Sequence, residues 1–147
     1  MRAHAWAAII AMAALAPAQA QQAPGWTADR NGCRVWNSTP KSGETIIWSG
    51  RCKGGYADGY GVLVWLRDGK LIETYTGVLM GGHYTGHGTQ IWDDGAIYTG
   101  DYMDDRADGP GIYRSPDGEV FSGIWEDGCF KDGRRRGAMG VPFSKCQ

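Results

Sequence analysis

The chain lacks three features that would assign it to a familiar functional class. The apolar run from Ala5 to Leu15 is far shorter than the roughly 20 residues that cross a bilayer, and no later segment qualifies. The formal charge is only −1, so no overall attraction to nucleic acid or to an anionic membrane is expected. No Gly-x-Ser-x-Gly, His-Glu-x-x-His or phosphate-loop motif occurs. We therefore predict no catalytic residue, no cofactor and no nucleic-acid partner.

The first twenty residues have the pattern of a secretory signal peptide. Arg2 gives a basic start, the apolar run follows, and Ala18-Gln19-Ala20 is a small-x-small cleavage pattern. We expect residues 1–20 to be removed, which changes the formal charge from −1 to −2 because Arg2 is lost. Residues 21–31 show no strand pattern and are predicted to form a flexible N-terminal segment. The protein is predicted to be periplasmic or secreted.

A motif of an aromatic residue, any residue and glycine recurs along the chain. It occurs at Trp48-Ser49-Gly50, Tyr75-Thr76-Gly77, Tyr98-Thr99-Gly100 and Phe121-Ser122-Gly123, in steps of 27, 23 and 23 residues. Pairs of glycines keep the same period, at Gly59 and Gly61, Gly86 and Gly88, and Gly109 and Gly111. A fixed interval of this size indicates one small unit that is copied several times and is stable only when stacked on its neighbours.

Turn signals divide each unit into two short strands. Ser-Gly or Asp-Gly pairs occur at 42–43, 68–69, 94–95 and 117–118. In the strand after each turn, the aromatic residue, the glycine and a second large residue alternate and so share one face of the sheet. The glycine leaves a gap that the neighbouring strand's aromatic ring can cover. We predict an all-β fold: an elongated single-layer antiparallel sheet of stacked β-hairpins, preceded by an opening hairpin at 32–52.

The third copy carries a family resemblance. Tyr98-Thr99-Gly100-Asp101-Tyr102, followed by Gly109-Pro110-Gly111, resembles the MORN repeat, whose pattern runs aromatic-x-Gly-x-aromatic-x-x-Gly and ends in Gly-x-Gly. The resemblance covers residues 48–133, with repeats that start near 48, 75, 98 and 121. Asp105 departs from the pattern where the other copies have glycine. The array is placed at 32–133 with a C-terminal tail at 134–147, because Asp132 and Arg134 replace the closing glycines of the fourth copy.

Four cysteines in an exported chain suggest two disulfides, and four cysteines allow three pairings. The register of the repeats favours one of them. Thr89 and Tyr102 are symmetric about the Asp94-Gly95 turn and should face each other. Cys33 and Cys52 stand in the same relation about Ser42-Gly43, so we pair them across the opening hairpin. By elimination Cys129 pairs with Cys146 and holds the C-terminal tail against the last repeat.

Two groups of residues are candidate binding sites. The first is an aromatic groove on one face of the sheet, formed by Trp65, Trp92, Tyr98, Tyr102 and Trp125. These rings are expected mainly to pack on one another, with some left accessible to a partner chain or a sugar. The second is a basic patch formed by Arg134, Arg135 and Arg136, which could contact an anionic membrane or could simply keep the terminus solvated.

Histidines and carboxylates give no further site. His83 and His87 are four residues apart but lie in loop and strand rather than on a helix, so we predict solvent-facing positions and no metal. The aspartates recur at turns, where a short side chain bonds the local backbone. Paired glycosidase carboxylates in a tryptophan-lined groove remain an alternative with no particular residue to name.

MORN-repeat proteins commonly act as scaffolds for protein association, and several have been linked to lipid contact. The resemblance therefore implies a non-enzymatic exported binding module that uses its groove, with protein as the leading partner. A binder of envelope glycan or phospholipid is the alternative, and a hydrolase of an envelope polymer is a third hypothesis. Exposed edge strands allow either a monomer or an edge-to-edge dimer.

Overall fold

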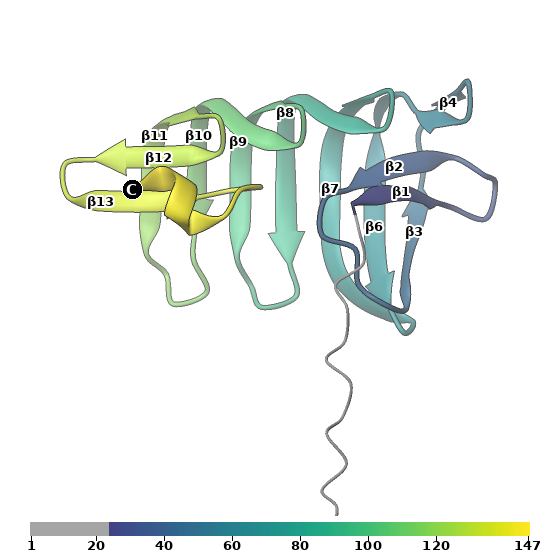
Figure 1. The fold of residues 1–147 in the computed structure, drawn as a ribbon, viewed down its shortest axis with the longest axis horizontal. Coiled ribbons are helices and arrows are strands. Elements are labelled where there is room, and N and C mark those ends of the chain that lie inside the picture. Colours follow the sequence, from purple (N-terminus) through teal and green to yellow (C-terminus); the bar gives the residue numbers. More distant parts are fainter. Residues whose placement is uncertain (1–23) are drawn as a thin grey trace, which may run out of the picture.

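The fold is an elongated antiparallel sheet of stacked β-hairpins that does not close on itself (Figure 1). The computed structural model describes residues 24–147, so the predicted signal peptide at 1–20 lies outside the described residues. Nine strands form the sheet in the order β13-β12-β11-β10-β9-β8-β7-β6-β3. Their bounds are β3 Glu44–Trp48, β6 Gly59–Arg67, β7 Lys70–Met80, β8 His83–Trp92, β9 Ile97–Met103, β10 Arg106–Arg114, β11 Val120–Glu126, β12 Cys129–Asp132 and β13 Arg135–Ala138.

A second, four-stranded sheet covers one end of the large one. Its order is β1-β2-β5-β4, with bounds β1 Gly25–Ala28, β2 Arg34–Asn37, β4 Cys52–Lys53 and β5 Tyr56–Ala57. The prediction of an unstructured segment at 21–31 is wrong for residues 25–28, because Trp26 and its neighbours pair with β2. Aromatic contact supports this strand, since the Trp26 ring packs edge-on against Trp36 at 5.2 Å and Tyr56 at 4.8 Å.

The prediction of an opening hairpin at 32–52 is also wrong. β3 pairs with β6, whereas β2 pairs with β1 and, in parallel, with β5. β2 crosses the turns at the end of the large sheet, where the amide of Arg34 donates to Gly55 O and that of Trp36 donates to Gly82 O. These carbonyls belong to turns far along the chain, so they give β2 partners that hairpin reasoning does not consider.

Successive hairpins are joined by two-residue turns whose central residues both have positive φ. Gly81 and Gly82 have φ of 57° and 84°, and Asp104 and Asp105 have φ of 46° and 66°. Such turns match the twist of the flanking strands and favour glycine. Asp105 replaces glycine here, but its carboxylate accepts the Tyr84 amide at 2.7 Å and thereby stabilises the turn.

The turns also join one repeat to the next through the same backbone bond. The amides of Gly82, Asp105 and Gly128 donate to Ala57 O, Tyr84 O and Ala107 O at 2.8, 3.2 and 2.8 Å. Each bond links the second turn residue of one repeat to the strand of the repeat before it. This recurring bond is the structural counterpart of the 23-residue period.

Tyrosine rings lie flat over pairs of glycines in the core. A methyl group on Gly100 would lie 2.6 Å from the Tyr98 hydroxyl, and one on Gly111 only 2.3 Å from it. Tyr75 covers Gly77 and Gly88 in the same way. Each ring therefore covers the glycine two residues later in its own strand as well as the facing glycine of the neighbouring strand, whereas the prediction considered only a ring from the neighbouring strand.

The strand register also differs from the prediction by three residues. Thr89 faces Thr99, and Tyr102 faces Gly86. The reason is the position of the turn, because Ile91 and Ile97 close the hairpin and centre it on Asp94.

Both disulfides join the cysteines paired in the sequence analysis, at 33–52 and 129–146. The first bridge has a different setting from the one expected. Cys33 lies just before β2 and Cys52 begins β4, so the bridge connects the two strands that flank β5. It therefore joins the start of β2 to β4 within the small sheet instead of crossing the predicted hairpin.

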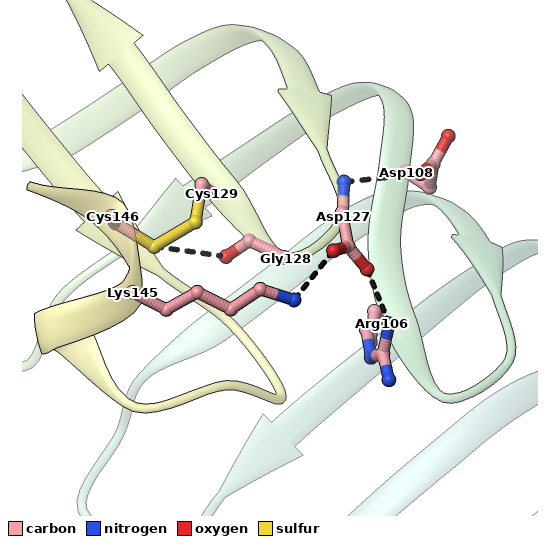
Figure 2. The surroundings of a disulfide bond; sticks show 7 residues. All are labelled: Arg106, Asp108, Asp127, Gly128, Cys129, Lys145 and Cys146. Carbon is pink, nitrogen blue, oxygen red and sulfur yellow. Dashed lines mark hydrogen bonds and ion pairs between the residues drawn. A yellow bond between two sulfur atoms is a disulfide. The ribbon is translucent and has the colours of Figure 1, made fainter.

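The second disulfide holds the C-terminal segment against the end of the large sheet (Figure 2). The sheet continues past residue 133, where the array was predicted to stop, because β13 pairs with β12. The chain then forms a short 3₁₀ helix, η1 Phe143–Cys146. Met139 donates its amide to Gly128 O at 2.7 Å, so this segment also binds a turn carbonyl.

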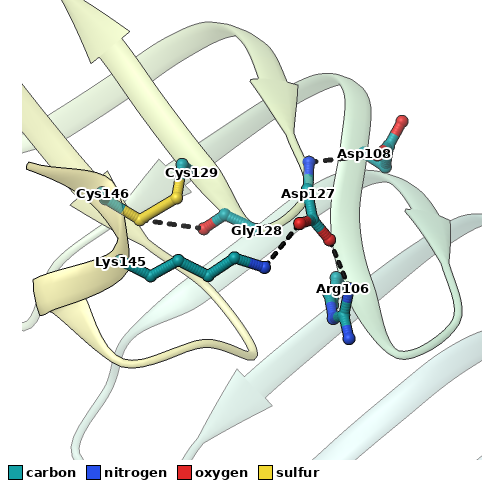
Figure 3. A network of polar contacts seen from close by, with 7 residues as sticks. All are labelled: Arg106, Asp108, Asp127, Gly128, Cys129, Lys145 and Cys146. Carbon is teal, nitrogen blue, oxygen red and sulfur yellow. Dashed lines mark hydrogen bonds and ion pairs between the residues drawn. A yellow bond between two sulfur atoms is a disulfide. The ribbon is translucent and has the colours of Figure 1, made fainter.

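A network of charged side chains lies beside that disulfide (Figure 3). Asp127, in the turn before β12, pairs with Lys145 of η1 and with Arg106 of β10, and its amide donates to Asp108 at 3.1 Å. Hydrogen bonds from Lys145 and then Arg106 hold the pKa of the Asp127 carboxyl below its usual value. The network ties the C-terminal helix to two successive turns.

Candidate binding groove

A groove of about 450 Å³ crosses the middle of the large sheet. β2 and the loop after it bound one side, and Met139 and Gly140 bound the other, because these two segments cross the sheet from opposite ends (Figure 1). We call it the central groove. It is lined by Trp36, Asn37, Ser38, Thr39, Lys41, Glu44, Trp65, Arg67, Ile72, Glu73, Tyr84, Gln90, Trp92, Asp93, Tyr102, Asp105, Ala107, Met139 and Gly140.

A chain of polar contacts forms the floor of the central groove. The Trp65 indole donates to the Tyr84 hydroxyl at 3.0 Å, and that hydroxyl donates to the Glu73 carboxylate at 3.1 Å. The Tyr84 ring stacks on the Tyr75 ring, with centroids 4.0 Å apart and planes inclined by 4°, and this contact restrains its position. Next to them the Tyr102 hydroxyl donates to Gln90 at 2.9 Å.

Glu73 is half-buried in this floor. Desolvation raises the pKa of its carboxyl, and hydrogen bonds from Gln90, Tyr84 and Trp92 offset part of that effect. Burial also raises the pKa of the Tyr84 hydroxyl well above its ordinary value, with the Glu73 charge as the second cause. A phenol held in its neutral form stays a hydrogen-bond donor at any physiological pH.

Glu44 and Arg67 form an ion pair at one end of the groove. Their side chains are 2.8 Å apart, and Glu44 also accepts the Asn37 amide and the Lys41 backbone N–H, both at 2.9 Å. Burial by itself raises the pKa of Glu44, but these bonds, led by that from Arg67, bring it below the usual value. The charge of Arg67 is therefore used within this pair.

The predicted aromatic residues separate into two sets. Trp65, Trp92 and Tyr102 line the central groove. Tyr98 and Trp125 do not, and with exposed fractions of 0% and 1% they belong to the core. The prediction that Tyr98 and Trp125 belong to the groove is therefore wrong. Trp65 and Tyr102 are also buried, at 7% and 4%, so Trp92 is the one half-exposed ring of the five.

Several groove residues were missed. Glu73, Tyr84 and Gln90 occupy inward positions of β7 and β8, so strand alternation through Tyr75 and Trp92 could have found them. Trp36 lies outside the repeats, and no pattern in the sequence places it over β7 and β8.

Two arginines of the basic patch make hydrogen bonds that stabilise the last hairpin. Arg135 donates to Val120 O at 3.0 Å and pairs with Asp132 at 2.7 Å. Arg136 donates to Gly133 O at 2.7 Å. Arg134 is exposed.

The two histidines contact carboxylates of neighbouring repeats. His83 lies 2.6 Å from Asp105 and packs against Trp26 and Trp36, whereas the more exposed His87 lies 3.0 Å from Asp101. His83 is thus part of the packing under β1 and β2, not a freely solvated side chain. Within residues 24–147, no group of three or more His, Cys, Asp or Glu side chains is arranged to hold a metal ion.

The MORN repeat family model matches three segments, residues 49–65, 75–97 and 98–120. The chain is a MORN-repeat protein. None of the curated proteins compared with it matches. MORN repeats are found in binding and scaffold modules with protein or phospholipid partners, and such modules are generally non-catalytic.

Two further observations concern the compartment of this MORN-repeat protein. Two disulfides are typical of an oxidising, extracellular-type environment. In the described part of the chain, no helix is both long and apolar enough to cross a membrane.

Proposed function

We propose that this MORN-repeat protein is an exported, non-enzymatic binding module whose central groove holds a segment of a protein partner. The observation that carries the proposal is the groove itself, which combines half-exposed rings of Trp36 and Trp92 with the polar floor around Glu73. Sites of this kind use apolar walls for affinity and a few polar groups for orientation. Export is supported by the signal-peptide pattern and by the disulfides.

The charge of the lining favours a protein over an anionic membrane. Four carboxylates line the central groove, whereas Lys41 and Arg67 are its two cationic residues. Such a surface repels phosphate headgroups, and two arginines of the basic patch that could attract them, Arg135 and Arg136, are hydrogen-bonded to backbone carbonyls of the last strands and their turn.

An envelope glycan is the second candidate ligand. Trp36, Trp65 and Trp92 present indole rings to the groove beside the amides of Asn37 and Gln90. Aromatic faces next to amide groups suit the apolar faces and hydroxyls of sugars.

The test is photocrosslinking from the groove. A photoreactive phenylalanine analogue replaces Trp92 in the full chain, expressed in its native envelope, and the control carries it at Ser122, which is exposed on the other face of the sheet. We expect one partner to be captured from Trp92 and not from Ser122, and the purified partner to lose affinity for Trp92→Ala but not for Ser122→Ala. Equal capture from both positions would contradict the proposal.

Two further arms separate the alternatives. Retention on purified cell-wall glycan that is lost in Trp92→Ala would replace protein with glycan as the ligand. Sedimentation with anionic vesicles that is lost when Arg134, Arg135 and Arg136 become glutamine would instead assign a membrane role to the basic patch. Size-exclusion chromatography with light scattering distinguishes a monomer from a dimer formed through the edge strands β3 and β13.

A further inference from the structure

The floor of the central groove contains a carboxylate without a cationic partner. Among the described residues, every hydrogen-bond partner of Glu73 is a neutral side chain, from Tyr84, Gln90 and Trp92. Of the two cationic residues in the lining, Arg67 is paired with Glu44, and Lys41 makes no hydrogen bond or ion pair with Glu73. A partly desolvated carboxylate gains most from a positive charge when it has none already.

Two tryptophans flank this carboxylate on the neighbouring strands. In the register of the sheet, Trp65 of β6 faces Glu73, and Trp92 of β8 faces it from the other side. All three line the groove. Indole faces attract cations, and the attraction grows when water is excluded. The cross-strand row Trp65–Glu73–Trp92 therefore places a carboxylate between two indole rings, of which Trp92 is half-exposed and Trp65 is 7% exposed at the groove floor.

We propose that the central groove binds a basic side chain of the protein partner, with its ammonium or guanidinium group against the Glu73 carboxylate between Trp65 and Trp92. The proposal rests on the proposed function and specifies the residue type that the partner must present. The excess of carboxylates in the lining supports a cation over an anion, and the 450 Å³ volume holds a long side chain together with its backbone.

The pH dependence of affinity distinguishes a direct contact with Glu73 from a purely structural role of this residue. A bound cation favours the carboxylate form, so affinity should fall as the pH drops through the raised pKa of Glu73. Glu44 on β3, Tyr84 on β8 and Tyr102 on β9 interact with it electrostatically, and the other charged groups of the groove lining are Lys41, Arg67, Asp93 and Asp105. Both tyrosines have pKa values above 10 and stay neutral over this range.

The experiment uses small probes on the full mature chain. N-acetyl-lysine N-methylamide is titrated while the indole N–H signals of Trp65 and Trp92 are followed by NMR, in parallel with its side-chain-acetylated form and the norleucine analogue. We expect the lysine probe to bind at least tenfold more tightly than either neutral probe at pH 8, and to lose that preference at acidic pH.

Glu73→Gln keeps an oxygen that can accept the Tyr84 hydroxyl but removes the charge, and Glu126→Gln is the matched control at an exposed position. We expect the first variant to abolish the preference for lysine and the second to retain it. Equal binding of the three probes, an unchanged preference in Glu73→Gln, or no binding of any probe would each overturn the inference. Tighter binding of phosphocholine would also overturn it, since the site would then belong to a lipid headgroup.

The outcomes separate this inference from the proposed function. A partner captured at Trp92 whose affinity does not respond to acetylation of its lysines or neutral replacement of its arginines leaves the proposed function intact and refutes the cation site. Failure of capture at Trp92, with lysine binding still dependent on Glu73, refutes the protein partner alone.

Discussion

Replacing Gly100 with alanine tests the packing that defines the repeat. Gly100 has no unusual φ, so its requirement is steric. A methyl group there would lie 2.5 Å from the Gly111 Cα, 2.6 Å from the Tyr98 hydroxyl and 2.7 Å from Pro110 O. Two of these three neighbours are backbone atoms, so a side-chain rotation cannot relieve the clash.

The cost can be assembled from its parts. Overpacking in a well-packed core costs about 1–3 kcal/mol. Tyr98 is fully buried and donates to Asp101 O at 3.1 Å, so moving the ring adds about 1 kcal/mol for the lost hydrogen bond. Alanine also offsets about 0.4–1 kcal/mol of this cost, because it lowers the conformational entropy of the unfolded chain. We expect Gly100→Ala to lower the free energy of unfolding by about 2 kcal/mol.

Urea unfolding followed by tryptophan fluorescence, with disulfides intact, measures this change. With an m-value of about 2 kcal/mol/M, the midpoint should fall by about 1 M. Gly95→Ala is the control, because nothing lies within 4 Å of its Cβ position and only its φ of 92° opposes alanine, at about 1 kcal/mol. A loss for Gly100→Ala no larger than for Gly95→Ala would refute the proposed packing of tyrosine on glycine.

Three further predictions concern the groove and the C-terminal segment. The pKa of Glu73 is raised on folding, so between its ordinary value and its folded value the native state binds more protons than the unfolded state, and stability falls as pH rises. Glu73→Gln should therefore unfold at a higher temperature than wild type at pH 8 and at the same temperature at pH 4. A lower unfolding temperature for the variant at pH 8 would contradict this. Tyr102→Phe removes the donor to the buried Gln90 and should cost about 1–2 kcal/mol in the same urea assay, whereas no change would show that the amide finds another partner. Replacing both Cys129 and Cys146 with serine should lower the free energy of unfolding by about 3 kcal/mol, because the closed loop spans 17 residues. Limited proteolysis of this variant should cut first after residue 133. Cleavage elsewhere would argue against a C-terminal segment held by this bond.

The repeat and its strands could be predicted from the sequence because they depend on local patterns. Aromatic-x-glycine spacing and Asp-Gly turns are properties of short segments, and each hairpin from β6 to β11 lies where those signals put it. Alternation along β8 also places Trp92 on the inward face. The register was wrong by three residues because turn length, which the dipeptide alone does not specify, moves the centre of the hairpin.

The two sides of the candidate site depend on long-range contacts instead. Trp36 covers the groove because β2 bonds the carbonyl of Gly82, and Gly140 closes the other side because it packs against the carbonyl of Asp105. Neither segment belongs to a repeat, so periodicity carries no information about where it lies.

The sequence by itself determined the stacked hairpins and their inward aromatic face, because glycine and ring spacing along one strand decide which residues can pack there. Only the tertiary structure decided which of those rings stay accessible. Tyr98 and Trp125 are covered while Trp92 stays half-exposed in a groove, since two non-repeating ends of the chain cross the sheet and leave its middle open. The position of that opening depends on backbone hydrogen bonds between residues far apart in sequence, which no local pattern encodes.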